Sequence, residues 1–145
     1  MHTSLDQEKL GVHQASLEFI TWTIPLLEGL SGSASVRNQL DRASTSVPLN
    51  IAEGNGKFTS PDRCRFFDNA RGSALESAAC LDVMLARRFA SAAEVQTGKA
   101  MLVKIVSMLF GLIRGNSDVR VFEEQASYRV AEKAKKNRNR SKNTK

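Results

Sequence analysis

The stretch QLDRASTSVPLNIAEGNGK, Gln39 to Lys57, carries the pattern that decides the fold. Its apolar residues recur every three or four positions, as they do along one face of an α-helix. The pattern begins at about Ser35 and continues to Glu53, and Gly54 is expected to stop the helix. The ending Gly-Asn-Gly-Lys also resembles a phosphate-binding loop, so the segment needs a second test.

A Walker-type loop requires a glycine, four residues of any kind, then Gly-Lys and a serine or threonine. Here Ile51 stands where the first glycine should be, and Phe58 stands where the serine or threonine should be. Such a loop also connects a strand to the start of a helix, whereas this one follows a helix. We therefore interpret the segment as a helix ending that is bent by Pro48, not as a nucleotide site.

Three other segments show helical periodicity: Leu5–Leu30, with Pro25 inside it, Ser60–Phe89 and Ser91–Arg114. Ser60 is expected to cap the third helix, ahead of a proline at the first helical position. Ser91 and Glu94 have the spacing of a capping box, which predicts the start of the fourth helix.

The sequence thus predicts an all-α protein, an up-down-up-down four-helix bundle in residues 1–128 with its core at about 10–115. A short extra helix at 117–130 is one interpretation of the next segment, and a brief strand around Val119 is the other. Residues 129–145 hold eight Lys/Arg and one Glu, whereas the rest of the chain holds 13 bases and 14 acids. This basic C-terminal tail is expected to be disordered because it has too few apolar residues to bury.

Catalytic and metal-binding groups are sparse. Both histidines, His2 and His13, lie near the N-terminus, away from any nucleophile or second ligand pair. Cys64 and Cys80 are sixteen positions apart in one expected helix, about 24 Å, which a disulfide cannot span. We expect no enzyme activity, no cofactor and no metal, and we interpret both cysteines as small buried residues.

The segment Met101–Ile113 is apolar on more than one helical face. It is shorter than a membrane span of about 20 residues and is interrupted by Lys104, so no membrane partner is expected. The N-terminus also lacks the features of a signal peptide, and a cytoplasmic location is the default expectation. The surplus apolar surface is better explained by contact with another subunit.

Several polar residues fall within the expected helices. Glu53 and Arg71 are interpreted as a buried ion pair that fixes the packing of the second helix on the third. A ligand site between these helices is the alternative.

Two linked motifs make the chain recognisable: Q-L-x-R-A-x-x-S-x-x-x-N-I-A-E-G-x-G, then F-x-x-x-A-x-G-S-x-x-E. The positions are filled by Gln39, Leu40, Arg42, Ala43, Ser46, Asn50, Ile51, Ala52, Glu53, Gly54 and Gly56, and then by Phe66, Ala70, Gly72, Ser73 and Glu76. Over about residues 10–115 the chain resembles the four-helix-bundle proteins named for open reading frames in intervening sequences of bacterial 23S ribosomal RNA genes. The resemblance implies a ring-shaped homopentamer with a central channel, and structural roles for the motif residues.

A branch related to this family, the accessory variability determinants of diversity-generating retroelements, binds nucleic acid and associates with a reverse transcriptase. The leading hypothesis for this chain is a non-enzymatic oligomer that binds RNA or DNA non-specifically through its tail. The candidate contacts are Arg129, Lys133, Lys135, Lys136, Arg138, Arg140, Lys142 and Lys145, helped by Arg63, Arg65, Arg87 and Arg88 if these share a face. Beyond Tyr128 there is no aromatic among the basic residues, so sequence-specific base stacking is not indicated. The alternatives are a protein-interaction scaffold without nucleic-acid binding and an accessory subunit of a retroelement reverse transcriptase.

Overall fold

The computed structural model describes residues 4–32 and 34–142, and within them it contains four α-helices and no strand. The helices are α1 (Ser4–Glu28), α2 (Ser35–Asn55), α3 (Ser60–Ala86) and α4 (Ala92–Lys142). The predicted all-α class is confirmed.

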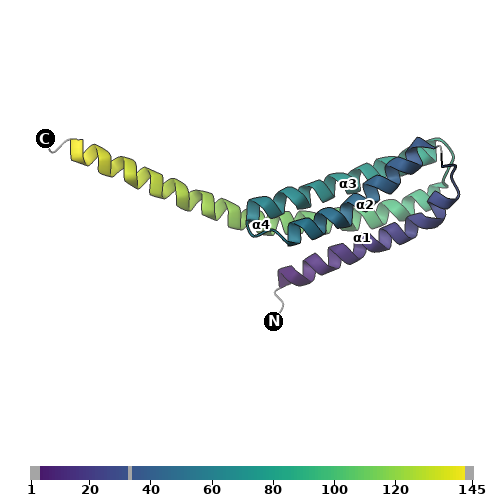
Figure 1. Ribbon diagram of the computed structural model, residues 1–145, viewed down its shortest axis with the longest axis horizontal. Helices are drawn as coiled ribbons and strands as arrows, with labels where there is room; N and C mark the ends of the chain where they lie inside the picture. Colours follow the sequence, from purple (N-terminus) through teal and green to yellow (C-terminus); the bar gives the residue numbers. More distant parts are fainter. Residues whose placement is uncertain (1–3, 33, 143–145) are drawn as a thin grey trace.

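The helices lie side by side, and the links join neighbouring ends of consecutive helices (Figure 1). α2 packs against α3 and α3 against α4, while α1 contacts both α2 and α4. The C-terminal part of α4 leaves this bundle and continues as a single helix. The molecule therefore has a four-helix bundle at one end and a single projecting helix at the other.

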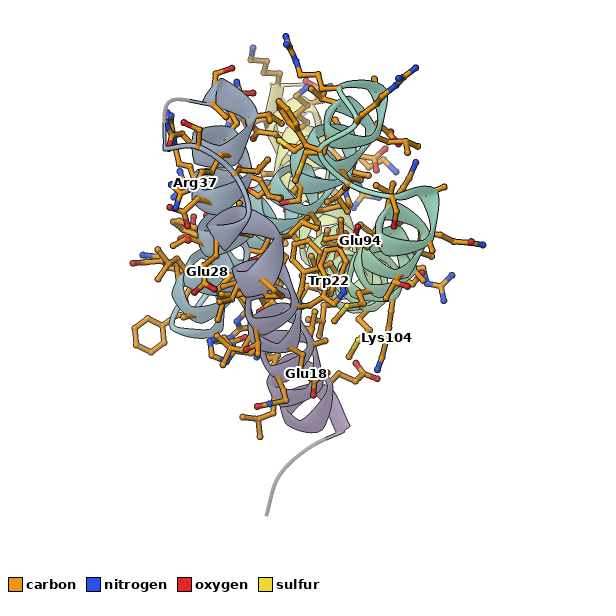
Figure 2. The ribbon with its side chains drawn as sticks, turned by 90° about the vertical axis from the view of Figure 1, so that its right-hand side faces the viewer. Glu18, Trp22, Glu28, Arg37, Glu94 and Lys104 are labelled. Atoms are coloured by element: carbon orange, nitrogen blue, oxygen red, sulfur yellow. The ribbon has the colours of Figure 1, made fainter. Side chains whose placement is uncertain are left out.

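The core is formed by one apolar stripe from each helix. Its largest fully buried side chains include Phe19, Leu40, Ile51, Phe67, Leu81, Met84, Leu102 and Leu109. Trp22 points from α1 towards α4 (Figure 2). Gly98 on α4 makes room for it, since a Cβ there would lie 2.5 Å from the Trp22 ring.

The start of α3 lies one residue earlier than predicted. The cap is Thr59, whose hydroxyl accepts a hydrogen bond from the backbone N–H of Asp62 at 3.3 Å, whereas Ser60 is already helical and buried. The predicted capping box of α4 is confirmed. The Ser91 N–H donates to the Glu94 carboxylate at 2.9 Å, and the Glu94 N–H donates to the Ser91 hydroxyl at 3.1 Å.

Gly54 does not end α2, contrary to the prediction. The helix continues to Asn55, and Gly56 caps it with a right-handed backbone (φ −84°). Gly54 is buried inside the helix, where a Cβ would lie 2.7 Å from the Phe67 ring. The glycine is thus required by close packing of α3 on α2. Both Pro25 and Pro48 lie inside their helices, and neither interrupts the helix.

The largest difference from the prediction is the length of α4. The expected stop at Gly115, the separate element at 117–130 and the disordered tail are replaced by one helix that runs to Lys142. A glycine inside a helix costs only about 1 kcal/mol, and the Ala, Lys, Arg and Glu residues of the tail favour helix. The helix continues through Gly115 and Asn116. The Asn116 side-chain amide donates a hydrogen bond to the backbone carbonyl of Leu112, one turn earlier in the same helix, at 2.8 Å.

Within the described residues, the stretch Ala92–Ser117 of α4 is long and apolar enough, by length and composition alone, to cross a membrane. The argument from the sequence considered only Met101–Ile113, and the longer stretch passes the length criterion that this shorter run does not meet. Leu102, Ile105, Leu109 and Leu112 lie in the bundle core, and 28% of the most apolar window of this stretch is buried within the described bundle.

Candidate nucleic-acid interface

The part of α4 outside the bundle, which we call the α4 extension (residues 118–142), carries most of the predicted basic contacts. At 100° per residue, Lys133, Lys136 and Arg140 fall on one face of the helix. Lys135, Arg138 and Lys142 fall on a second face, roughly opposite the first. All six side chains are exposed.

The remaining two candidate contacts are Arg129, which lies within α4, and Lys145, which lies outside the described residues. Residues 130–142 contain six Lys/Arg and one acid, Glu132. The extension therefore presents positive charge on two sides of one exposed helix.

The loop between α2 and α3 lies where α4 leaves the bundle. The Cys64 thiol sits 3.6 Å from the carbonyl oxygen of Ile113 and 3.8 Å from the hydroxyl of Ser117. Arg63 and Arg65, in the first turns of α3, are thus near the root of the extension.

Arg87 and Arg88 follow the other end of α3, a helix of 27 residues, or about 40 Å. The four arginines that were expected to help the tail therefore do not share a face: two lie at each end of the bundle.

The polar residues of the family motif form a contact between α2 and α3. The hydroxyls of Ser46 and Ser73 are 2.8 Å apart across the interface. The Asn50 amide donates to both the carbonyl and the hydroxyl oxygen of Ser46, each at 2.9 Å. These three half-buried side chains satisfy one another and set the register of the two helices.

The predicted buried pair between Glu53 and Arg71 does not form. Glu53 is exposed and lies 3.8 Å from Lys57, while Arg71 makes a 2.9 Å ion pair with Asp68. The helix register explains the difference, because Gly54 faces Phe67. Glu53, the neighbouring residue, is exposed, and its partner is Lys57, just beyond the end of the same helix.

The other motif residues, Gln39, Arg42, Gly72 and Glu76, are exposed. Arg42 lines a shallow, open hollow of about 560 Å³ on α2, together with Asn38, Asp41, Thr45, Ser46, Leu49 and Asn50. The motif thus comprises buried apolar residues, a half-buried polar contact between α2 and α3, and exposed residues on the surface of both helices.

Both cysteines are free and buried, as predicted. Burial raises the pKa of the Cys80 thiol, and the nearby Glu76 carboxylate raises it further. A neutral, buried thiol is a poor nucleophile and a poor metal ligand. Among the described residues, no group of three or more His, Cys, Asp or Glu side chains could hold a metal ion.

A family model described as 23S rRNA-intervening sequence protein matches residues 8–111. The chain belongs to this family. Among solved structures it is similar to a protein of unknown function from the S23 ribosomal protein family of Bacteroides thetaiotaomicron, with a TM-score of 0.69 and 20% identity. That similarity covers 74% of this chain and 98% of the other, and it concerns the fold alone. No match was found among curated proteins.

The match to the 23S rRNA-intervening sequence family ends at residue 111, just before α4 leaves the bundle. The hydrogen-bonded motif residues lie within the matched part. The α4 extension lies beyond it.

One surface residue of this family member was overlooked in the sequence: Phe58. Its side chain is 94% exposed, on the loop between α2 and α3. In the sequence, Phe58 was considered only because it differs from the Ser or Thr of a phosphate loop. An aromatic residue directly after a lysine is also a pattern found in proteins that bind single-stranded nucleic acid.

Proposed function

We propose that this protein is a non-enzymatic oligomer that binds RNA or DNA non-specifically through the α4 extension. The observation that carries the proposal is the exposed basic helix, with six Lys/Arg against one Glu in residues 130–142. Such a segment interacts with the phosphate backbone and releases its counterions, which supplies affinity without reading sequence.

The two basic faces of the extension support non-specific binding. Lys133 and Arg140 are seven residues apart, about 10 Å along the helix, so one face contacts only a few phosphates. The second face, with Lys135 and Lys142, offers an equivalent surface in another orientation. Either face can therefore bind phosphates at any position along the nucleic acid.

We also propose that the protomer is an up-down-up-down bundle that assembles into the homopentamer implied by the family resemblance. Two exposed apolar surfaces support assembly. Leu10, Leu17 and Ile24 form a line on α1 with a spacing of seven residues and exposures of 64, 40 and 48%. We call this line the α1 ridge.

The second apolar surface is a groove of about 150 Å³ between α3 and α4, which we call the α3/α4 groove. It is lined mainly by apolar side chains, including Leu75, Val103 and Val106. The ridge residues lie on α1 and the lining of the groove lies on α3 and α4, so ridge and groove are separate surfaces. A ridge that enters the groove of the next copy gives a head-to-tail interface, the type that forms rings when the rotation between copies closes.

Assembly increases the effect of the extension, because five basic helices on one particle raise the effective concentration for each further contact. The same α3/α4 groove favours a second candidate function, a protein-interaction scaffold that holds another protein and binds no nucleic acid.

The two candidates are separated by charge-neutralising variants of equal net charge. The first replaces Lys133, Lys136 and Arg140 with Gln, and the control replaces Arg87, Arg88 and Lys104 on the bundle. With structured RNA and with duplex DNA, we expect the extension variant to reduce the slope of log affinity against log salt by about 2 to 3. The control should bind like the wild type. Equal binding by the two variants would favour the scaffold.

A further inference from the structure

The loop between α2 and α3 exposes an aromatic ring that the fold does not use. Phe58 is 94% exposed, more than any other large apolar side chain in the described part of the chain. Full exposure of a phenylalanine forfeits about 2 kcal/mol of burial free energy. The exposed faces of this ring are therefore accessible to a planar group such as an aromatic ring or a nucleobase.

Three cations lie close to Phe58 in the sequence: Lys57 on the same loop, and Arg63 and Arg65 in the first turns of α3. The Arg63 guanidinium donates to the Lys57 carbonyl at 2.8 Å, which ties the loop to the helix. Lys57 and Arg65 both lie over the ring of Phe66, 5.0 and 4.9 Å from its centre. These contacts hold the two charges beside the loop without neutralising them.

The acidic residues near the loop do not cancel this charge. Glu53 lies 3.8 Å from Lys57, and both side chains are well exposed, so the pair is weak. Asp62, in the first turn of α3, is the second acidic residue, so the three cations exceed the two acids by one charge. The loop keeps an excess of positive charge next to an exposed aromatic ring.

The loop also lies at the root of the α4 extension, as the contact between Cys64 and Ser117 shows. From Ser117 to Lys133 the helix rises by about 24 Å. A nucleic acid bound along the extension can therefore reach the loop with a few further nucleotides.

We propose that Phe58 stacks on an unpaired base of RNA or single-stranded DNA, while Lys57, Arg63 and Arg65 contact the adjacent phosphates. Exposed aromatic rings between basic residues bind single strands in this way, independently of sequence. The inference rests on the proposed nucleic-acid binding and adds a preference for unpaired over paired strands, since bases inside a duplex cannot stack on the ring.

A second copy of the chain is the competing occupant of this surface. The α3/α4 groove is an apolar surface that could receive Phe58, but its lining includes Lys99 and no acidic residue, and the carboxylate beside it, Asp82, is already paired with Lys99 at 2.8 Å. The cations near Phe58 would meet Lys99 there and a carboxylate that is already paired. A phosphate backbone supplies that charge, and for this reason we assign the loop to nucleic acid.

The test compares Phe58→Ala, Phe58→Trp and wild type by fluorescence anisotropy. The probes are an oligouridylate of about twelve nucleotides and an RNA duplex with the same number of phosphates. Phe89→Ala is the matched control, because Phe89 is a half-exposed phenylalanine beyond the other end of α3. Substitution of a fully exposed ring should leave the fold intact, which circular dichroism verifies.

We expect Phe58→Ala to bind oligouridylate about tenfold more weakly and the duplex unchanged. Phe58→Trp should bind both probes like the wild type, and so should Phe89→Ala.

If Phe58→Ala binds both probes like the wild type, the loop is not a binding site, although binding by the extension still holds. If the wild type binds neither probe at low salt, the proposed function itself fails. A change in the mass of the assembly, with unchanged affinity for oligouridylate, would assign the ring to contact between copies and overturn the inference.

Discussion

The backbone of Gly54 lies directly against the ring of Phe67: a Cβ on Gly54 would be 2.7 Å from one ring carbon and 2.9 Å from the next. Phe67 is fully buried, so its ring cannot swing away. We therefore expect Gly54→Ala to lower the free energy of unfolding by about 1–3 kcal/mol in urea denaturation.

Gly72 on α3 provides the matched control, because a Cβ there meets nothing within 4 Å. Gly72→Ala should stabilise the protein by about 0.5–1 kcal/mol, as alanine does when it replaces an unhindered helical glycine. Equal effects of the two substitutions would contradict the close approach of α2 and α3.

The hydrogen bond between Ser46 and Ser73 makes the two serines energetically coupled. In a double-mutant cycle of Ser46→Ala and Ser73→Ala, we expect a coupling energy of about 0.5–1.5 kcal/mol, measured by urea denaturation. A cycle of Ser46→Ala with Thr97→Ala, on the exposed side of α4, should be additive. Additive effects in both cycles would contradict a stabilising hydrogen bond between Ser46 and Ser73.

The capping box at the start of α4 predicts a pH dependence. Hydrogen bonds from the backbone N–H and the side chain of Ser91 lower the pKa of Glu94. The stabilisation by ionised Glu94 is therefore present above the pKa of the unfolded chain, about 4.3, and is lost as pH falls through the lower folded pKa. The difference in Tm between wild type and Glu94→Gln should shrink towards zero between neutral pH and pH of about 3.

Ser91→Ala is the comparison for this experiment. Loss of the serine hydroxyl should cost about 1 kcal/mol at neutral pH, and part of that cost should remain in acid, because this hydroxyl also accepts the Glu94 backbone N–H, which does not titrate. A Glu94→Gln effect that stays constant down to acid pH would exclude the role given to the carboxylate.

The proposed ring has an interface that single substitutions can break from either side. Leu17→Glu on the α1 ridge and Val103→Glu in the α3/α4 groove should each reduce a pentamer to smaller species in light scattering, because each buries a charge without a partner. An equimolar mixture should form dimers, since the intact ridge of one variant fits the intact groove of the other. Leu49→Glu, on the exposed face of α2, is the control and should leave the assembly unchanged.

The sequence was sufficient for the existence of the four helices and for the family, but not for the length of α4, which was expected to end at Arg114. The spacing of Leu40, Val47 and Ile51 reflects burial along one helix, and such local periodicity is directly visible. The capping box at Ser91 was equally local and correct. The family motif could be assigned because most of its residues serve these same contacts.

The errors arose where tertiary contacts outweigh local signals. Gly54 looked like a helix stop because its reason, the Phe67 ring, lies on another helix. The pair of Glu53 with Arg71 depended on a register that no spacing within α2 reveals. The importance of Phe58 lies in its exposure, which appears only when the bundle is assembled.

The central claim is that the α4 extension binds nucleic acid through phosphates. The most direct measurement is a salt titration of binding to a structured RNA, with the full chain and with a chain that lacks residues 131–145. The account predicts that affinity of the full chain falls linearly on a log–log scale, and that truncation weakens binding and flattens the slope by several units. Affinity that is unaffected by the truncation, or that is absent even at low salt, would contradict it.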